Sequence, residues 1–423
     1  EEKRIEGKLT GQITPKHSLS GSFLKLSANI TDRCLPGTGR CWELASLSQT
    51  VEDQPQDLYS GTYNGIFTNN LLVEAFWSKS SITFGGGGGL SGPAVGATPV
   101  DFAALGQWAG PSEFCGDCTP QVRKADTWGV KPTYYWSTRV LGTHNIVGGY
   151  KQFTDSIFAN NHQSGSDFTV YDLDPRQVRS ADGSVTPRMA RDAGLIVWWP
   201  ILQDAQPNNL TTRSLFVNDK WDLNNHWSFN VGARYDKNDG KNEAGFKIAD
   251  DSKVSPRLGL TFDTFGNGRL RFNASYSQYV SQIANGNIAD ASSPAGSPSL
   301  LYWLYYGPSL SGLPTDQFVA KVFDWFNSIG GTSNRTFLAG GGTNGIGTQI
   351  PNSLHSPSVR EIAVGVGSQV GRNGYIRVDY QDRDWGDFFV DEVNLGTGTV
   401  FDPLIGAKVD RGILTNTEQL NRT

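Results

Sequence analysis

The strongest constraint in this sequence is a strict alternation of apolar and polar residues with a period of two. In residues 227–236 the odd positions, from Trp227 to Tyr235, are apolar or aromatic, and the even positions are small, polar or charged. Residues 269–277 repeat the pattern with the apolar residues at the even positions. Side chains alternate between the two faces of a β-strand, whereas a helix has a period of about 3.6 residues. Both segments are therefore predicted to be strands with one apolar and one polar face.

Weaker alternation of the same kind recurs along the chain, for example in residues 5–13, 24–30, 73–77, 254–262, 362–366 and 376–380. The strands predicted from it are about 10 to 14 residues long. An ordinary globular strand has about 5 or 6 residues, and a tilted strand that crosses a bilayer has about 9 to 11. The strand length therefore favours a membrane-crossing sheet.

Short and long connections largely alternate between these strands. Short turns are predicted near residues 14–17, 68–70, 142–145, 223–225, 264–268 and 371–373. Long connections are predicted at 31–56, 85–130, 159–209, 239–252, 284–356 and 387–412. Outer-membrane barrels have short periplasmic turns and long extracellular loops. We count about twelve strands and the beginning of another, which predicts an all-β, antiparallel transmembrane β-barrel that is only partly present.

The polar faces and the strand ends fit such a barrel. Arg, Lys and Asp occur in the middle of the strands, where they would line a wide, wet lumen. Aromatic residues near strand ends are predicted to form girdles at the lipid interface, and the candidates are Trp77, Trp221, Trp227, Tyr235 and Tyr276.

Composition excludes several other classes of protein. The 423 residues are 37% hydrophobic and 11% aromatic, and this aromatic content is too high for a disordered chain. No stretch approaches the ~20 apolar residues of a membrane-spanning helix. The net charge is −5 and the basic residues are scattered, so we expect no nucleic-acid partner.

One predicted hairpin resembles a known family. Residues 253–263 read KVSPRLGLTFD and, after a short glycine-containing turn, residues 269–276 read RLRFNASY. This pair resembles the mid-barrel hairpin of TonB-dependent outer-membrane receptors. The sequence PAGSP at 294–298, the aromatic residues at 302–306 and the strand opening SVRE at 358–361 are similar to the Oar-like branch of that family.

The resemblance implies a barrel of about 22 strands in the cell outer membrane, closed by an N-terminal plug domain and coupled to the TonB complex. Residues 1–423 would then be a partial barrel domain of about 12 to 13 strands, without the plug, the TonB-contacting box and the C-terminal strands. The chain starts at Glu1 with no initiator Met or signal peptide, as expected of a processed chain or a fragment. Mid-strand arginines would line the lumen wall that faces the plug, namely Arg234, Arg257, Arg271 and Arg377.

The four cysteines form two close pairs in loops rich in Gly and Pro, Cys34 with Cys41 and Cys115 with Cys118. The CxxC spacing of the second pair also suits zinc or a redox motif. Zinc would need two further ligands, the first pair has the wrong spacing, and no thioredoxin-like βαβ pattern surrounds the motif. We therefore predict loop disulfides formed in an oxidising compartment.

Acidic residues gather at the outer end of a late strand. Asp384, Asp387 and Asp391, together with Asp382, are weak candidates for calcium binding, and a solvated rim is the preferred interpretation. Residues 236–240 lack the spacing of a calcium loop and are predicted to be an exposed hairpin tip. The sequence contains no recognisable catalytic triad, nucleophile elbow or metal-binding His cluster. We therefore expect no catalytic residue, no resident metal and no cofactor.

The long connection at 284–356 is the candidate ligand-binding region. It carries Tyr302, Trp303, Tyr305 and Tyr306, and a helix is predicted at 315–328 with an apolar stripe that includes Phe318, Val322 and Phe326. Aromatic side chains in an outer loop can stack on sugars or grip a peptide. They can equally pack on one another and fold the loop over the barrel mouth, which is the preferred interpretation.

The expected function is uptake or surface recognition of an unidentified small molecule, glycan or peptide. The expected partners are outer-membrane lipid and, by resemblance, the protein's own plug domain and the TonB complex. A plugless porin or surface adhesin barrel is the main alternative. A secreted all-β carbohydrate-active enzyme is a remote one, and it would be soluble without detergent and hold two carboxylates ~5 to 9.5 Å apart.

Overall fold

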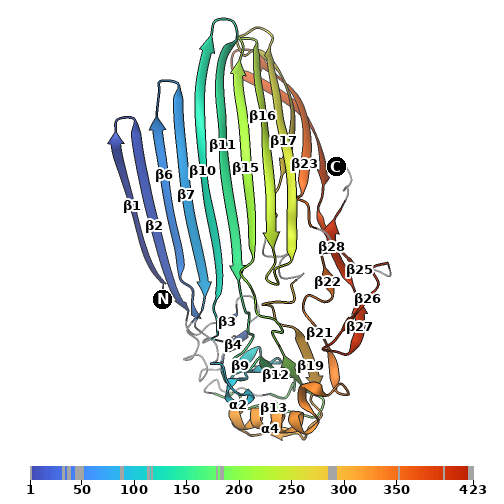
Figure 1. Cartoon of the computed structure of the whole chain (residues 1–423). Coiled ribbons are helices and arrows are strands. Elements are labelled where there is room, and N and C mark those ends of the chain that lie inside the picture. The colour runs from blue at the N-terminus through green and yellow to red at the C-terminus, as the bar shows by residue number, and fades with distance from the viewer. Residues whose placement is uncertain are drawn as a thin grey trace.

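The computed structural model describes residues 2–30, 34–35, 40–42, 52–85, 90–111, 115, 118–177, 180–181, 185–283, 293–350, 353–393 and 396–417. Its largest part is a tall, thirteen-stranded antiparallel sheet, which we call the wall (Figure 1). A smaller, separately packed unit lies at the end of the wall where the long connections meet, and we call it the cap (Figure 1). Twelve wall strands follow one another in chain order: β1 Glu2–Thr14, β2 His17–Ile30, β6 Gln56–Ile66, β7 Leu71–Phe84, β10 Gln121–Thr138, β11 Gly142–Phe158, β15 Asn209–Asp222, β16 Trp227–Lys241, β17 Lys247–Asp263, β18 Leu270–Val280, β23 Ser358–Val370 and β24 Gly374–Gly386.

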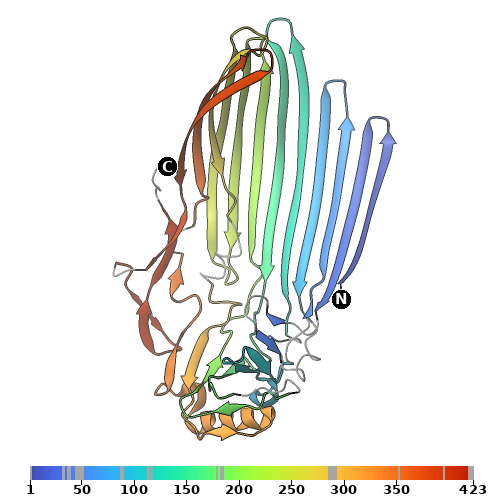
Figure 2. The same ribbon diagram turned by 180° about the vertical axis from the view of Figure 1, so that it is seen from behind.

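The wall strands are neighbours in the order in which they occur in the sequence. The short strand β5, Glu52–Asp53, pairs with β2 outside this path. β1 and β24 are the edge strands of the wall. Among the described residues, each of them pairs with a neighbouring strand on one side only. Figure 2 shows the same succession from behind, with the N-terminus beside one edge of the wall. The predicted strands and their antiparallel pairing are confirmed.

The wall exposes its apolar face. On β16, Val231 and Tyr235 keep 48% and 44% of their surface exposed, whereas Asp236 keeps 6%. Residues that lie opposite one another in an antiparallel pair share a face, so the register carries this division from strand to strand. Val231 lies opposite Leu258, and Leu258 lies opposite Tyr276. We call the apolar, exposed face the outer face and the polar one the inner face.

Two predicted connections are wrong, and the one predicted at 85–130 is shorter than expected, because β10 begins at Gln121. The turn predicted at 142–145 lies at 139–141, and β11 begins at Gly142, which has φ 72°. A Cβ at Gly142 would come within 2.1 Å of the carbonyl oxygen of Asp222, so glycine stands there because the next strand approaches closely. The long connection predicted at 239–252 is mostly strand, since β16 ends at Lys241 and β17 starts at Lys247. The end of β16, residues 236–241, is polar or glycine on both faces, so the alternation that marks the strands is lost there.

The cap is built from the long connections, four of which supply its larger sheet. Its eight-stranded sheet has the order β21 Leu338–Gly342, β19 Leu300–Leu304, β14 Gly194–Trp198, β12 Phe168–Asp172, β8 Val100–Phe102, β9 Gln107–Ala109, β4 Arg40–Trp42 and β3 Cys34–Leu35. Smaller elements complete this end of the molecule: β13 Arg188–Met189 with β20 Leu310–Ser311, β22 Thr348–Gln349 with β28 Gly412–Asn416 and β25 Phe389–Val393, β26 Thr399–Asp402 with β27 Ala407–Asp410, the single turn α2 Ala94–Ala97 and the 3-10 helix η1 Gly331–Ser333.

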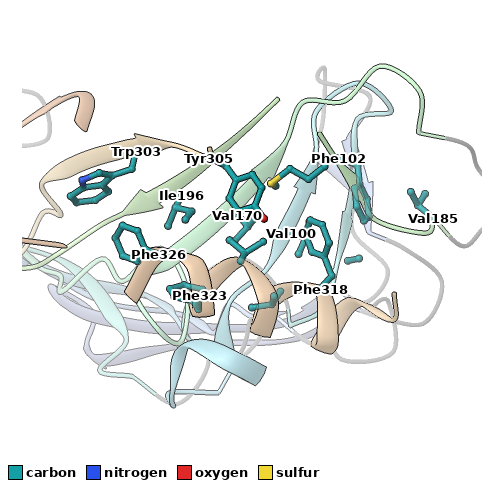
Figure 3. Packing of buried hydrophobic residues seen from close by; sticks show 14 of the residues in the cluster. Val100, Phe102, Val170, Val185, Ile196, Trp303, Tyr305, Phe318, Phe323 and Phe326 are labelled. Carbon is teal, nitrogen blue, oxygen red and sulfur yellow. The ribbon is translucent and has the colours of Figure 1, made fainter. Parts of the chain in front are cut away.

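Helix α4, Thr315–Ser328, covers this sheet and confirms the predicted helix. Its apolar stripe, Phe318, Val322 and Phe326, is almost completely buried. Figure 3 shows Phe318 and Phe326 beside Val100, Val170 and Ile196 of the sheet strands, and Val322 belongs to the same buried cluster. Burying so many aliphatic and aromatic side chains gives the cap a hydrophobic core of its own. None of the described helices is long and apolar enough to cross a bilayer.

Candidate functional site

The four arginines predicted for the lumen wall lie on one face, the inner face. Arg234 shares this face with Gly232, which lies opposite Arg257. Arg271 lies opposite Asp263 on the strand that carries Arg257, and Gly367 lies opposite both Arg271 and Arg377. The structure therefore gathers arginines from β16, β17, β18 and β24 on one polar surface.

Three of these guanidinium groups are held by carboxylates. The Nε of Arg234 donates to Asp236 at 2.8 Å, and that of Arg377 donates to Asp379 at 2.8 Å. The Nε of Arg271 donates to Asp263 at 3.3 Å. The guanidinium carbon of Arg257 lies 5.4 Å from the centre of the Tyr279 ring, which is cation–π geometry. The four side chains are thus held on the inner face of the wall. Those of their guanidinium N–H groups that are not used in these contacts can donate to a further partner.

A recess of about 370 Å³ opens on this face, close to the short-turn end. Small residues make room for it: a Cβ at Gly365 would come within 2.2 Å of the carboxylate of Asp379. Its polar lining consists mainly of Lys220, Ser228, Asn230, Thr261, Asn273, Arg377 and Asp379. A mixture of both charges with amides and hydroxyls suits contact with another protein surface or with water.

The outer face ends at the short turns in a row of rings. His144 is stacked between Trp136 and Trp221, with ring centres 5.0 and 5.3 Å apart. The Nδ1 of His144 lies 2.7 Å from the carboxylate of Asp219, so this polar atom of the imidazole ring has a hydrogen-bond partner. Trp227 continues the row against Phe262 at 4.4 Å. The girdle candidates Trp77, Trp221, Trp227, Tyr235 and Tyr276 all lie on this exposed face.

Two of the predicted ligand-binding aromatics are core residues of the cap. Trp303 and Tyr305 are 0% exposed. The indole of Trp303 donates to the carbonyl oxygen of Asn334 at 2.7 Å, and the hydroxyl of Tyr305 donates to that of Pro308 at 2.7 Å. Burial raises the pKa of Tyr305 to about 12. The prediction of ligand contact is wrong for this pair, because their strand turns them into the core beneath α4.

Tyr302 and Tyr306 remain half-buried candidates for ligand contact. Tyr302 lies opposite Gly340, whose missing side chain leaves space for the phenol ring. Tyr306 packs at 5.5 Å against Phe337, and Arg191 lies 6.0 Å above its ring. A separate pocket of about 460 Å³ opens beside the end of α4, lined by Ala94, Phe168, Phe323, Phe326, Asn327, Gly330, Gly331 and Thr332. This pocket therefore combines three phenylalanine rings with the polar side chains of Asn327 and Thr332.

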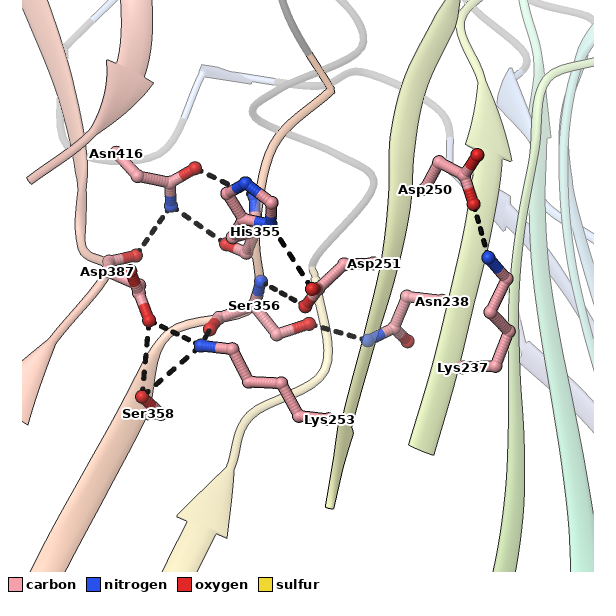
Figure 4. A network of polar contacts seen from close by, with 10 residues as sticks. All are labelled: Lys237, Asn238, Asp250, Asp251, Lys253, His355, Ser356, Ser358, Asp387 and Asn416. Carbon is pink, nitrogen blue, oxygen red and sulfur yellow. Dashed lines mark hydrogen bonds and ion pairs between the residues drawn. The ribbon is translucent and has the colours of Figure 1, made fainter. Parts of the chain in front are cut away.

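A polar network fastens late segments to the inner face of the wall (Figure 4). The buried carboxylate of Asp251 accepts from the backbone N–H of Ser356 at 2.8 Å, and Asn238 donates to the hydroxyl of Ser356 at 2.5 Å. Lys253 is paired with Asp387. The side-chain amide of Asn416 donates to the backbone carbonyls of His355 and Asp387, at 2.8 and 2.7 Å.

This network corrects the interpretation of residues 236–240 as an exposed hairpin tip. Asp236 and Asn238 are nearly fully buried, because Ser214 donates to Asp236 and Thr212 to Asn238, each at 2.5 Å. The sequence contains a signal for this longer strand. On β16, polar residues continue at every second position on the inner face beyond Tyr235, the last apolar residue of the outer face.

The weak calcium candidates are not brought together. Asp384 is paired with Arg360 at 2.5 Å and Asp387 with Lys253, so each carboxylate already has a cation. Asp391 lies on β25, which pairs with β28 and not with the strand that carries Asp382 and Asp384. Within the described part of the chain, no group of three or more His, Cys, Asp or Glu side chains could hold a metal ion.

One of the two predicted disulfides is described. Cys115 and Cys118 are joined, with their Cα atoms 5.3 Å apart, just before β10 begins. The backbone places Cys34 of β3 opposite Cys41 of β4. The side chains of that pair lie outside the described residues, so their disulfide stays a prediction.

The cap also buries a carboxylate that the sequence did not single out. Asp172 is 0% exposed and accepts the backbone N–H groups of Asp174 and Arg188, at 3.1 and 3.0 Å. Burial raises the pKa of Asp172 to about 6. The hydrogen bonds from the Arg176 guanidinium hold the pKa of neighbouring Asp174 down, to about 2. The two carboxylates thus respond to pH in different ranges.

Comparison with known proteins gives one consistent result. Residues 44–311 match the family described as "TonB dependent receptor-like, beta-barrel". The TonB-dependent transporter Oar of Myxococcus xanthus is 24% identical over 340 residues, which are 68% of this chain and 31% of that protein.

Two solved structures share the fold. The outer membrane transporter YddB from Escherichia coli superposes on 98% of this chain and 42% of its own, with a TM-score of 0.50 and 14% identity. The siderophore receptor PirA from Acinetobacter baumannii superposes on 100% of this chain and 48% of its own, with a TM-score of 0.51 and 14% identity. The chain thus spans less than half the length of each of these three relatives.

Proposed function

Since the chain belongs to the TonB-dependent receptor-like β-barrel family, we propose that it forms part of the wall and the extracellular cap of an outer-membrane receptor that takes up or recognises a ligand. Barrels of this family lie in the outer membrane. By the general architecture of such barrels, the short turns would lie in the periplasm and the cap outside the cell. The partial antiparallel transmembrane barrel expected from the sequence is confirmed.

The observation that carries the proposal is the distribution of exposed apolar residues on the wall. Leu215, Val231 and Leu258 are 59%, 48% and 46% exposed on the outer face. Such a continuous apolar surface would aggregate in water, and lipid is the environment that covers it. The inner face, with its arginines and its recess, has the polarity of a lumen wall.

The remaining barrel strands and a plug domain are proposed to belong to the parent protein. This proposal is supported by the three relatives, because this chain spans less than half the length of each of them. In the complete barrel, the arginine row and the recess around Lys220 and Asp379 would face the plug, and the mixed charges there would pair with complementary groups on it. Energy for uptake would come from the TonB complex through that plug.

The ligand would first meet the cap. Tyr302, Tyr306 and the pocket beside α4 are the accessible aromatic surfaces for a small molecule, glycan or peptide. The family consists of receptors and transporters, and we propose that this chain likewise performs no catalysis. The exposed apolar wall argues against a secreted carbohydrate-active enzyme.

A plugless porin remains the competing function, and electrical conductance separates the two. We would insert the purified full-length parent protein into planar lipid bilayers. A plugged receptor is expected to pass no steady current, and to open only when a few molar urea loosens the plug. Steady ohmic channels without denaturant would contradict the receptor and support a porin.

A further inference from the structure

The pocket beside the end of α4 lies at the tip of the cap. Figures 1 and 2 both show α4 and the single turn α2 at the end of the cap that is farthest from the wall strands. Ala94 of α2 and Phe168 of β12 line one part of the pocket, and six residues of the stretch 323–332 line the rest. Its volume of about 460 Å³ is within the range of small-molecule sites, roughly 300 to 1,000 Å³. A ligand bound here would lie outside the lumen.

Three phenylalanine rings form the apolar part of this pocket. The centre of the Phe168 ring lies 5.2 Å from that of Phe323 and 6.2 Å from that of Phe326, with the ring planes at 87° and 73°. The rings of Phe323 and Phe326 are 6.1 Å apart at 83°, so the three planes are nearly perpendicular to one another. Phe323 and Phe326 are buried, whereas Phe168 is half-buried. Edge-to-face packing on the two buried rings holds Phe168 as a rigid aromatic surface for a ligand.

The polar groups of the pocket have no partners of their own. Among the residues that the structure describes, neither the side-chain amide of Asn327 nor the hydroxyl of Thr332 forms a hydrogen bond. The carbonyl oxygen of Phe326 accepts none, because the N–H of Gly330 donates to the carbonyl of Asn327 at 3.1 Å. A helix end leaves such carbonyls unpaired, and the last turn of α4 carries no basic residue that could bind them. An amide, a hydroxyl and a carbonyl therefore remain available to a ligand.

The lining also restricts the charge of the ligand. None of the eight side chains that line the pocket is charged. An anionic ligand would therefore find no cation there, and an ammonium group would find no carboxylate. A purely apolar ligand would cover the three polar groups without giving them hydrogen bonds, which is unfavourable. The ligand that fits is neutral, with one apolar face and several hydrogen-bonding groups.

We propose that this pocket binds a pyranose unit of a neutral glycan. The C–H groups on one face of a pyranose ring would pack against the ring of Phe168, as apolar groups do on aromatic surfaces. Its hydroxyl groups both donate and accept hydrogen bonds. They would donate to the carbonyl of Phe326 and pair with Asn327 and Thr332. Because the site lies at the tip of the cap, its role is recognition of a glycan at the cell surface.

This inference rests on the proposed function only for the position of the cap outside the cell. It does not depend on uptake through the lumen. Steady ohmic channels in the conductance experiment would contradict the receptor and leave the glycan pocket intact. Lack of glycan binding would contradict the pocket and leave the receptor intact.

The first test is a binding array probed with the fluorescently labelled, full-length parent protein in detergent. The array carries neutral glycans, glycans that contain uronic acids or sulfate, and neutral peptides rich in aromatic residues. The expected result is binding to neutral glycans that share one terminal pyranose, without binding to the acidic glycans or the peptides. Binding to none of the neutral glycans would overturn the proposal, as would equal or tighter binding to the acidic glycans or to the peptides.

A pair of double variants locates the site, with the best neutral glycan of the array as the titrant in calorimetry. Asn327→Ala with Thr332→Val removes two hydrogen-bonding groups and should weaken binding roughly ten-fold or more. Gln317→Ala with Ser333→Ala is the matched control, because both residues are exposed on α4 or just after it and neither lines the pocket. The control should bind as the unchanged protein does. Equal affinities of the two double variants would overturn the proposal.

Substitutions of Phe168 and Ala94 separate stacking from a general effect on the fold. Phe168→Leu keeps an apolar side chain without the ring and should weaken binding about five-fold, whereas Phe168→Tyr keeps the ring and should bind as the unchanged protein does. Ala94→Trp would fill the pocket from α2 and should abolish binding. Resistance of the cap to protease shows whether each variant is folded. Full binding by folded Phe168→Leu and Ala94→Trp variants would show that the glycan binds elsewhere and would overturn the proposal.

Discussion

Ser356 donates its backbone N–H to the buried carboxylate of Asp251 at 2.8 Å, although the two residues are 105 positions apart in the sequence. Asp251 belongs to wall strand β17, and Ser356 belongs to the segment that leads from the cap into wall strand β23. With the Lys253–Asp387 pair, this contact binds two late segments to the inner face (Figure 4). The cap is thereby tied to the wall at points beyond its own connections.

Removing the carboxylate should release this attachment. Asp251→Ala leaves the N–H of Ser356 without an acceptor and is expected to cost about 1 to 3 kcal/mol locally. Limited proteolysis should then cut near residues 350–358 several times faster, while the wall keeps its heat-modifiable migration. Asp250→Ala is the matched control, because that neighbour forms exposed ion pairs with Lys237 and Lys247, which contribute little. Equal effects of both variants would contradict a specific attachment at Asp251.

The cap should unfold without the wall when its core is opened. Trp303→Ala removes a fully buried indole and its hydrogen bond to Asn334, and is expected to cost about 3 to 5 kcal/mol. The expected outcome is rapid digestion of the cap, with the wall strands protected by detergent or lipid. Tyr302→Ala, at a half-buried position on the same strand, should be milder. Global loss of the folded gel band would show that the cap and wall are one cooperative unit.

Acidification should stabilise the cap between about pH 7 and pH 5. Burial raises the pKa of Asp172 to about 6, so the folded cap takes up a proton at a pH where the unfolded chain does not. Stability from this group is therefore lost as pH rises towards about 6, by roughly 3 kcal/mol in total, of which about 1 kcal/mol falls between pH 5 and pH 7. The raised pKa of His162, caused by its hydrogen bond to Asp167, acts in the same direction.

The substitution Asp172→Asn isolates the contribution of Asp172. The measurement compares the resistance of the cap to protease at pH 5 and at pH 7, in the variant and in the unchanged protein. The variant should lose the part of the difference that is due to Asp172 and keep the part that is due to His162. The Asp174–Arg176 pair does not interfere, since its low pKa, about 2, keeps that carboxylate charged throughout this range. An unaltered pH dependence in the variant would rule out Asp172 as the cause.

The Cys115–Cys118 disulfide should protect the connection before β10 without stabilising the whole protein. It closes a loop of only a few residues, for which chain entropy predicts about 2 kcal/mol or less. Reduction, or the double variant C115S and C118S, is expected to speed cleavage between residues 109 and 121 and to leave the melting temperature of the wall nearly unchanged. Cleavage at the same rate in both redox states would show that the disulfide has no protective role.

The wall could be predicted from the sequence because its physics is local. Alternation in β16 and β18 reports the two faces directly, since lipid on one side and water on the other select residues at every second position. The disulfide of Cys115 with Cys118 was also predicted, from the CxxC spacing together with the lack of further zinc ligands and of a thioredoxin-like pattern.

The cap could not be predicted to the same extent. Its strands β8, β12, β14 and β19 come from three separate connections, and their partners are decided by long-range packing that leaves no period in the sequence. The direction of Trp303 and Tyr305, into the core beneath α4, depends on that packing. Asp172 and Asp251 were missed for a related reason, because an isolated Asp gives no sign that it will be buried.

The central claim is that the apolar face of the wall meets lipid and the polar face does not. Spin labels placed one at a time on the full-length parent protein in lipid vesicles test it, by their collision rates with oxygen, which dissolves in lipid, and with a nickel chelate, which dissolves in water. Labels at Leu215, Val231 and Leu258 should favour oxygen, and labels at the adjacent positions Ser214, Gly232 and Arg257 should not. The same preference at adjacent positions, or its reversal, would contradict the account.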